Sequence, residues 1–383
     1  MKHSEAFDSN KDCCLADTDH DREVAVNDLL SPLTIRGVNF RNRIGLSPMC
    51  QYCAEEGFAN DWHLVHLGSR AVGGAALVMV EATAVTRDGR ISPGDMGIWD
   101  DRHIEPLSRI AQFILSQGSI PGIQLAHSGR KGSCEVPWKG GEKLKPGKGG
   151  WQTIAPSAVP FNDTDSIPKE LNEAEIEEIA KAFQIATKRA LKAGFQVIEI
   201  HSAHGYLLHE FLSPLSNKRK DQYGGDIENR MRLPLSIAES LRKLIPEELP
   251  LFTRISASDW VEGGWDIQHS VLLCKRLKEI GVDLIDVSSG GMVPKARIPV
   301  GKGYQVPFAK EIRDQAGILT AAVGLITEVQ HANEIITQGN ADLVFLGREF
   351  LREPYWVQKA SLELGKESSW PIQYGYAVKR RAK

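Results

Sequence analysis

Cysteine is scarce in this chain, which has six among its 383 residues. Cys13 and Cys14 are adjacent, and the other four are scattered along the sequence. This pattern does not build the dense disulfide framework of small secreted domains. The cysteine content therefore fits a reducing compartment, and we expect a cytoplasmic location.

Long apolar runs and an excess of basic charge are also missing. No stretch approaches the roughly 20 apolar residues of a membrane span, and the N-terminus lacks the apolar segment of a secretory signal. The formal net charge of -3 gives little support to nucleic-acid or membrane-surface binding. We therefore expect neither kind of partner, and we expect residues 1–27 to form a polar, disordered tail.

What the chain does contain is a series of eight short runs rich in apolar and β-branched residues. Most of them are continuous, as in strands that are buried on both faces of a parallel sheet. Helical patterns lie between the runs. In the clearest one Asn172 caps the start, Glu175 completes a capping box and Gly194 ends the helix. The runs are RIGLSPM, AALVMVEATAV, PGIQLAH, FQVIEIH, LFTRISAS, LIDVSSG, LTAAVG and LVFLGR.

Eight strands that alternate with helices form either a (β/α)8 barrel or a doubly wound sheet. A dinucleotide-binding doubly wound sheet carries G-x-G-x-x-G after its first strand, and this chain has none there. We therefore predict a TIM barrel, in a single α/β domain over residues 28–383 with a C-terminal extension. Two connections, residues 132–171 after strand three and 289–306 after strand six, are too long for simple turns. We expect both to be functional loops at the carboxyl end of the barrel.

Small and polar residues at the strand ends are the first candidates for a site, because barrel enzymes carry their sites there. Gly324 ends strand seven, and Gly347 and Arg348 end strand eight. Many barrels bind phosphate at this place through backbone N–H groups, and Arg348 could add a bidentate charge. The alternative is that Gly347 forms a turn and Arg348 a surface ion pair.

The segment HSAHGY, after strand four, contains His201, His204 and Tyr206. Two imidazoles at a strand end can bind a metal, donate paired hydrogen bonds to an oxygen, or act as acid and base. Tyrosine has a reference pKa of about 10, so Tyr206 would be a proton donor near neutrality. A metal needs a third protein ligand, and no acidic partner stands nearby, so we expect none. A packed loop with satisfied histidines is the alternative.

Gln124 and Arg254 interrupt apolar strands. A buried arginine must be paired or must face a polar or charged ligand, and a buried glutamine needs hydrogen-bond partners. Both would suit the walls around a polar, partly anionic ring system at the barrel mouth. A structural salt bridge is the alternative for Arg254.

Four segments, in this order, resemble the old yellow enzyme family of FMN-dependent ene-reductases. The likeness extends over about residues 28–376 and is strongest to the bacterial-type branch of xenobiotic reductases and NADPH dehydrogenases. The segments are SPMCQYCAEEGFANDWHLVHLGSRAVGGAALVMVEATAV, GIQLAHSGRKG, IEIHSAHGYLLHEFLSPLSNKRKDQYGGDIENRMR and VFLGREFLREP.

The resemblance implies FMN at the carboxyl end of the barrel and a reduced nicotinamide, NADPH or NADH, as electron donor. Gln124 would bond the pyrimidine edge, and Arg254 would face the N1/C2 carbonyl region, where a fixed cation favours the reduced form. Gly324, Gly347 and Arg348 would hold the phosphate. The remaining implied flavin contacts are Ser47, Pro48, Met49, Cys50 and Ala82.

The same resemblance implies a ping-pong reaction on a small molecule, an α,β-unsaturated carbonyl or similar electrophilic alkene. Hydride would reach the β-carbon while His201 and His204 donate hydrogen bonds to the carbonyl oxygen, where enolate-like charge builds. Tyr206 would then protonate the α-carbon, and Tyr52 would line the substrate pocket. Cys50 would tune the flavin potential, whereas Cys53, in the same C-x-x-C, is expected to be a bystander.

The chain departs from this family pattern near its C-terminus. Relatives close a neighbouring subunit's pocket with an Arg or a Trp, and here Tyr376 stands at about the Arg position and Ala377 at about the Trp position. Val300 stands where close relatives carry a pocket Trp, which predicts a roomier pocket. The resemblance also implies a homodimer or a homotetramer.

Three alternatives to a flavin ene-reductase can be weighed on the sequence, of which the last has little support. A flavin-free barrel lyase or isomerase acting on a phosphorylated substrate would need a lysine or a carboxylate at a strand end. A zinc hydrolase would join Cys50 and Cys53 to the two histidines of HSAHGY. A dienoyl-CoA-reductase-like flavoprotein would carry a cysteine cluster after the barrel, but no cysteine follows Cys274.

Overall fold

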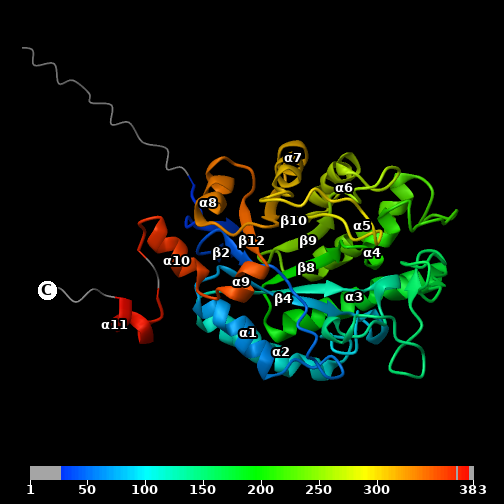
Figure 1. Ribbon diagram of the computed structural model, residues 1–383, viewed down its shortest axis with the longest axis horizontal. Helices are drawn as coiled ribbons and strands as arrows, with labels where there is room; N and C mark the ends of the chain where they lie inside the picture. The colour runs from blue at the N-terminus through cyan, green and yellow to red at the C-terminus, as the bar shows by residue number, and fades with distance from the viewer. Residues whose placement is uncertain (1–26, 368–369, 379–383) are drawn as a thin grey trace, which may run out of the picture.

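The computed structural model of the chain describes residues 27–367 and 370–378, and a barrel surrounded by helices forms its centre (Figure 1). Eight parallel strands close the barrel, which confirms the predicted (β/α)8 architecture. Each of the eight predicted runs supplies one strand. Residues 1–26 of the predicted tail lie outside the described residues. In the order around the barrel the strands are β10 (Leu284–Ser288), β11 (Leu319–Val323), β12 (Leu343–Leu346), β3 (Ile44–Leu46), β4 (Leu77–Ala84), β5 (Ile120–Ala126), β8 (Val197–Ser202) and β9 (Leu251–Ser256).

An N-terminal hairpin closes the amino end of the barrel, and the sequence did not reveal it. In this hairpin β1 (Leu33–Ile35) pairs antiparallel with β2 (Val38–Phe40). Phe40 is fully buried and stacks on Phe252, with the ring centroids 6.4 Å apart. Strands of three residues are too short to show a clear period. The hairpin residues Ile35, Val38 and Phe40 thus belong to one buried apolar cluster with residues of the barrel strands.

Helices cover the outside of the barrel (Figure 1). The clearest predicted helix is α3 (Glu173–Ala193), in which Asn172 and Glu175 form the predicted capping box and Gly194 ends the helix in the left-handed conformation. Every helix in the described ranges is too short or too polar to cross a membrane. The other outer helices are α1 (Asp61–Val72), α2 (Ile104–Ser116), α5 (Ile227–Leu244), α6 (Ile267–Ile280), α7 (Val306–Ala316), α8 (Val329–Thr337) and α10 (Trp356–Glu363). Shorter elements are α4 (Leu207–Leu212), α9 (Arg348–Arg352), α11 (Gly375–Val378), β6 (Ile154–Ala155) and β7 (Lys169–Glu170).

Two long connections leave the carboxyl ends of β5 and β10, as predicted. The first covers residues 127–172 and the second covers residues 289–305. They meet where the Arg130 guanidinium donates a hydrogen bond to the Met292 carbonyl oxygen at 2.8 Å. The two loops therefore form one layer over the carboxyl end of the barrel.

Candidate active site

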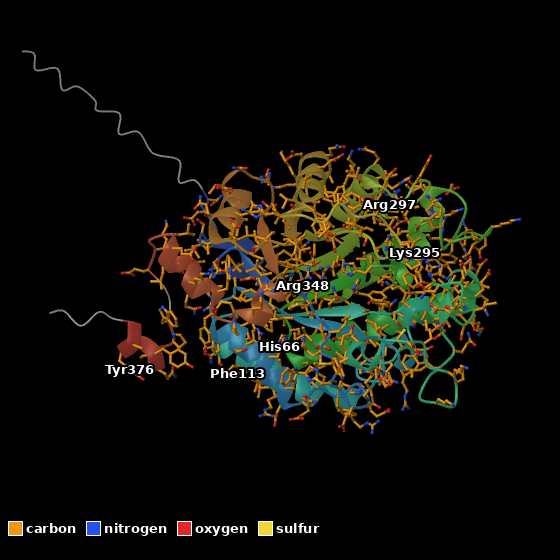
Figure 2. All side chains as sticks on the ribbon, viewed as in Figure 1. His66, Phe113, Lys295, Arg297, Arg348 and Tyr376 are labelled. Carbon is orange, nitrogen blue, oxygen red and sulfur yellow. The ribbon has the colours of Figure 1, made fainter. Side chains whose placement is uncertain are left out.

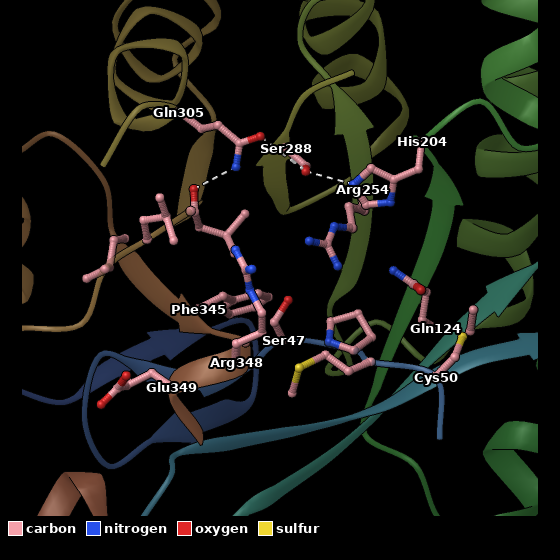
Figure 3. Close-up of a pocket in the computed structure, with 18 of the residues that line it drawn as sticks. Ser47, Cys50, Gln124, His204, Arg254, Ser288, Gln305, Phe345, Arg348 and Glu349 are labelled. Atoms are coloured by element: carbon pink, nitrogen blue, oxygen red, sulfur yellow. Dashed lines mark hydrogen bonds between the residues drawn. The ribbon is translucent and has the colours of Figure 1, made fainter. Parts of the chain in front are cut away.

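A cavity of about 450 Å³ opens at the carboxyl end of the barrel, where the strand ends converge (Figure 3). Every residue that we predicted to bind cofactor or substrate, or to take part in catalysis, lines this cavity. The structure thus brings together side chains that lie as far apart in the sequence as β3 and β12. The predicted residues that line it are Ser47, Pro48, Met49, Cys50, Tyr52, Ala82, Gln124, His201, His204, Tyr206, Arg254, Gly324, Gly347 and Arg348.

The end of β8 brings His201, His204 and Tyr206 together with their rings packed edge to face. The ring centroids of the two histidines are 5.2 Å apart, and those of His201 and Tyr206 are 5.1 Å apart. Between them the chain turns sharply, with φ of 60° at His204 and 70° at Gly205. This turn folds the segment back on itself, so that the three side chains face one cavity.

Burial sets the protonation of these groups. Burial, followed by the positive charge of Arg254, lowers the pKa of His201 and of His204 well below the usual value. Both imidazoles are therefore neutral at pH 7, with one N–H each. Nδ1 of His201 accepts the backbone N–H of Ala203 at 3.2 Å, which leaves the ring proton on Nε2. Burial raises the pKa of Tyr206 well above its usual value, so the phenol keeps a proton that it can donate.

A chain of hydrogen bonds continues from His204 to the next strands. Nε2 of His204 lies 2.7 Å from Oγ of Ser288 at the end of β10 (Figure 3). Nearby, Oε1 of Gln305 accepts a hydrogen bond from Ser289 at 2.6 Å, and Nε2 of Gln305 donates to the Val323 carbonyl at 2.8 Å. Sequence reasoning missed Gln305, because it follows a long loop and no strand pattern marks its position. The other lining residues that it missed are Tyr304, Val323, Leu325, Ile326, Thr327, Phe345, Glu349 and Arg352.

Two pairs of polar side chains on neighbouring strands border the cavity. Nε2 of Gln124 donates to Oε1 of Glu199 at 2.7 Å, and Nε of Arg254 lies 3.1 Å from Oδ2 of Asp286. Burial raises the pKa of Glu199 to about 8 and that of Asp286 to about 6. The positive charge of Arg254, which pairs with Asp286, opposes the rise in pKa of both carboxyl groups. Arg254 forms a salt bridge with Asp286 and also lines the cavity, so its contact with a ligand stays a prediction.

The residues present fit FMN. Arg254 lines the cavity, so its guanidinium can supply a cation and N–H donors to the polar edge of a ring, while its Nε lies 3.1 Å from Oδ2 of Asp286. Arg348 reaches the same cavity from α9 (Figure 3), which supplies a second cation suited to a phosphate. Met49 and Phe345 add apolar surface for a ring. The cavity therefore offers polar, apolar and cationic contacts to one ligand.

The two cysteines of the C-x-x-C lie in different surroundings. Cys50 lines the cavity, whereas Sγ of Cys53 lies 3.7 Å from Nε2 of His63 outside it. Both cysteines are free. Burial raises the pKa of Cys50 well above the usual value and that of Cys53 to about 11, so both thiols are protonated at pH 7. No group of three or more His, Cys, Asp and Glu side chains in the described residues could hold a metal, so the zinc alternative gains no support.

The residues that depart from the family pattern lie away from the cavity. Val300 is 63% exposed and Tyr376, on α11, is 88% exposed, and neither lines the cavity. Figure 2 shows Tyr376 well apart from Arg348. The roomier pocket and a role of Tyr376 or Ala377 in a neighbouring subunit therefore stay predictions.

Comparison with known proteins identifies relatives of this chain in sequence and in structure. A model of the NADH:flavin oxidoreductase / NADH oxidase family matches residues 28–367. An NADPH dehydrogenase of Geobacillus thermodenitrificans (strain NG80-2) is 51% identical over 348 residues, which cover 90% of this chain and 97% of the relative. The structure of an old yellow enzyme homologue from Zymomonas mobilis is 25% identical, with a TM-score of 0.74, over 90% of this chain and 95% of that one. A 2-naphthoyl-CoA reductase is 24% identical, with a TM-score of 0.80, over 89% of this chain and 53% of that one.

The family model covers most of the chain, and the bacterial relative shares about half of its residues along nearly its whole length. The solved structures share the barrel. The chain therefore belongs to the NADH:flavin oxidoreductase / NADH oxidase family, that of the old yellow enzymes, and is an FMN-dependent oxidoreductase.

Proposed function

We propose that this enzyme is an ene-reductase that reduces the C=C bond of an α,β-unsaturated carbonyl or a similar electrophilic alkene. The observation that carries the proposal is the arrangement of His201, His204 and Tyr206. Two neutral imidazoles lie beside a protonated phenol, at one cavity whose other walls suit FMN. These are the groups that the reaction needs, two donors for an oxygen and one acid for a carbon.

When bound, FMN would supply the redox chemistry, which is hydride transfer from a nicotinamide to the alkene. The protein's part is to hold this group. Arg348 would pair with its phosphate, with Gly324 and Gly347 offering backbone contacts, while Gln124 and Arg254 would bind the polar edge of its ring. The remaining contacts would come from Ser47, Pro48, Met49, Cys50 and Ala82.

The two histidines would bind the carbonyl oxygen of the substrate. Each neutral imidazole has one N–H. That of His201 is on Nε2 because Nδ1 accepts the Ala203 amide, and that of His204 would be on Nδ1, with Nε2 accepting the Ser288 hydroxyl. Negative charge builds on the substrate oxygen as hydride reaches the β-carbon. Hydrogen bonds to that oxygen therefore strengthen in the transition state and lower the barrier.

Tyr206 would deliver the proton to the α-carbon. Its ring centroid is 5.1 Å from that of His201, so a carbonyl held by the histidines brings the α-carbon close to the phenol. Tyr52 lines the same cavity and packs edge to face on Trp138, with the centroids 6.0 Å apart. We assign Tyr52 to the wall of the substrate pocket.

NADPH is the proposed electron donor, because the relative at 51% identity is named an NADPH dehydrogenase. We also propose that the enzyme works as a homodimer or a homotetramer, on the family resemblance, and its mass in solution tests this. The flavin-free lyase or isomerase alternative is set aside, because the chain belongs to a family of flavin oxidoreductases.

Purified enzyme tests the function directly. We expect a yellow protein that NADPH bleaches without oxygen and that an enone, a maleimide or a nitroalkene turns yellow again. A colourless protein that FMN cannot reconstitute would refute the cofactor assignment. A flavoprotein that NADPH reduces, but that none of the three alkene classes reoxidises, would refute the ene-reductase proposal.

A further inference from the structure

Lys131 connects three loops at the carboxyl end of the barrel, although no step of the proposed reaction uses it. It lies in the short helical turn Gly129–Lys131, which follows β5. Its ammonium donates hydrogen bonds to the carbonyl oxygens of His204 at 2.8 Å and of Gly291 at 3.0 Å. A side chain of one loop thus bridges the backbones of the two loops that follow β8 and β10.

These two carbonyls belong to a tight contact between backbones. The left-handed φ of His204 is uncommon for a residue with a side chain and needs surrounding contacts to hold it. The next residue, Gly205, presses directly on the second loop, because a Cβ at this position would overlap the Gly291 carbonyl oxygen. The Lys131 ammonium donates one hydrogen bond to the carbonyl of His204, which has the left-handed φ, and one to the carbonyl of Gly291, in the loop that Gly205 contacts.

The ammonium also places a charge beside the reacting groups. Nζ lies 5.2 Å from the centroid of the Tyr206 ring, within the range of a cation–π contact. Its charge adds to the effects of burial and of Arg254, which lower the pKa of His201 and of His204. Lys131 therefore helps to keep both imidazoles neutral.

Lys131 itself is charged at pH 7. Burial lowers its pKa to about 8, which still lies above neutral pH. The ammonium form, with three donors, predominates at neutral pH, and the two carbonyl oxygens accept two of these hydrogen bonds.

We propose that Lys131 is a positioning residue, whose two hydrogen bonds fix the His204–Gly205 turn against Gly291 and thereby hold His204 and Tyr206 in place for carbonyl binding and proton transfer. The catalytic part of this inference rests on the proposed ene-reductase function, and the positional part does not. A misplacement of about 1 Å at reacting groups costs on the order of 100-fold in rate.

Lys143 offers a matched control. Lys131 and Lys143 line the same neighbouring cavity of about 710 Å³. Lys143 also donates to two carbonyl oxygens, those of Arg130 and Gly132, each at 2.6 Å, but both belong to its own loop. Lys131→Met removes the charge and both hydrogen bonds, Lys131→Gln retains an amide donor, and Lys143→Met removes an equivalent pair away from the His204 turn. All variants are measured as full-length, FMN-loaded enzyme.

Amide hydrogen exchange tests the positional part without a substrate. We expect Lys131→Met to speed up exchange in residues 203–206 and 289–292 by roughly tenfold, Lys131→Gln to have a smaller effect, and Lys143→Met to leave both segments unchanged. Unchanged exchange in Lys131→Met, or equal acceleration in Lys143→Met, would overturn the inference. If Lys131→Met does not load FMN, Lys131→Gln takes its place. Faster exchange in residues 203–206 and 289–292 in Lys131→Gln than in Lys143→Met would then support the inference, and equal exchange in the two variants would overturn it.

Steady-state reduction of an enone by NADPH tests the catalytic part. We expect Lys131→Met to lower kcat by about 10- to 100-fold and to change KM less, with partial recovery in Lys131→Gln. Lys143→Met should retain the wild-type kcat. A wild-type enzyme that reduces no enone overturns the proposed function, and the exchange data still decide on the contact. An active wild type with an unchanged kcat in Lys131→Met overturns the inference about Lys131 alone.

Discussion

Nε of Arg254 lies 3.1 Å from Oδ2 of Asp286 on the neighbouring strand, and both side chains are buried beside the cavity. The carboxylate offsets part of the cation's charge and fixes its position. A positive charge near the flavin ring stabilises the reduced form, which carries more negative charge. If Arg254 binds the flavin ring as proposed, the pair would set how strongly the protein favours reduced FMN.

Removal of the positive charge of Arg254 and removal of the negative charge of Asp286 should shift the flavin potential in opposite directions. We expect Arg254→Met to lower the midpoint potential of bound FMN and to weaken its binding, and Asp286→Asn to raise the potential. A shift on the order of 30 mV corresponds to about 1.4 kcal/mol for a two-electron couple. Potentiometric titration checks both, and shifts of the same sign in the two variants would contradict the assigned electrostatics.

Loss of the proposed acid, Tyr206, should slow reoxidation of the enzyme by an enone without slowing its reduction by NADPH. Tyr206→Phe removes only the phenol oxygen, and we expect reoxidation of the reduced enzyme by an enone to slow by roughly 100-fold or more. Reduction by NADPH should change little, because it requires no proton from Tyr206. Stopped-flow measurement of each half-reaction decides, and equal slowing of both would assign Tyr206 to binding instead.

The proposed carbonyl ligands give a second kinetic test. His201→Ala removes the N–H donor on Nε2, and we expect slower reoxidation by enones because the developing oxygen charge loses a hydrogen bond. Loss of one such donor typically costs about 100- to 1,000-fold in rate. If neither His201→Ala nor Tyr206→Phe slows reoxidation, the roles given to both residues are wrong.

The C-x-x-C provides a matched pair of substitutions. We expect Cys50→Ala to shift the flavin potential and turnover, because Cys50 lines the cavity. Cys53→Ala should have little effect on either, because its thiol contacts His63 outside that cavity. Spectroelectrochemistry and steady-state rates of the two variants provide the comparison, and equal effects would revive a joint dithiol role.

Stability should depend on pH through Glu210, which is fully buried and accepts the Arg130 backbone N–H at 2.9 Å. Burial raises the pKa of Glu210 from 4.5 to about 8, so between these pH values the folded state binds a proton that the unfolded state lacks. The contribution of Glu210 to the free energy of unfolding therefore decreases as the pH rises from about 4.5 to about 8. We therefore expect the Tm of Glu210→Gln minus the Tm of the wild type to increase from pH 5 to pH 8. A difference in Tm that does not change with pH would contradict this.

The sequence predicted the barrel because each of its strands is a buried apolar run, as in β4, where all eight residues are buried. The site residues were predictable where a polar residue interrupts such a run, as Gln124 and Arg254 do. The hairpin of β1 and β2 was missed because three-residue strands show no clear period. Gln305 and Lys131 were missed for another reason. Gln305 bonds to a carbonyl of β11 and Lys131 to a carbonyl of the loop after β8, and the fold alone brings these partners close.

Isotope tracing during enone reduction tests the central claim most directly. The enzyme is supplied with NADPH that carries deuterium on the transferred position, and the product is examined by NMR. We expect one deuterium at the β-carbon and ordinary hydrogen from water at the α-carbon, since in the proposed reaction hydride would pass through FMN and the proton would come through Tyr206. Deuterium at the α-carbon, or no reduction of the C=C bond, would contradict the proposed reaction.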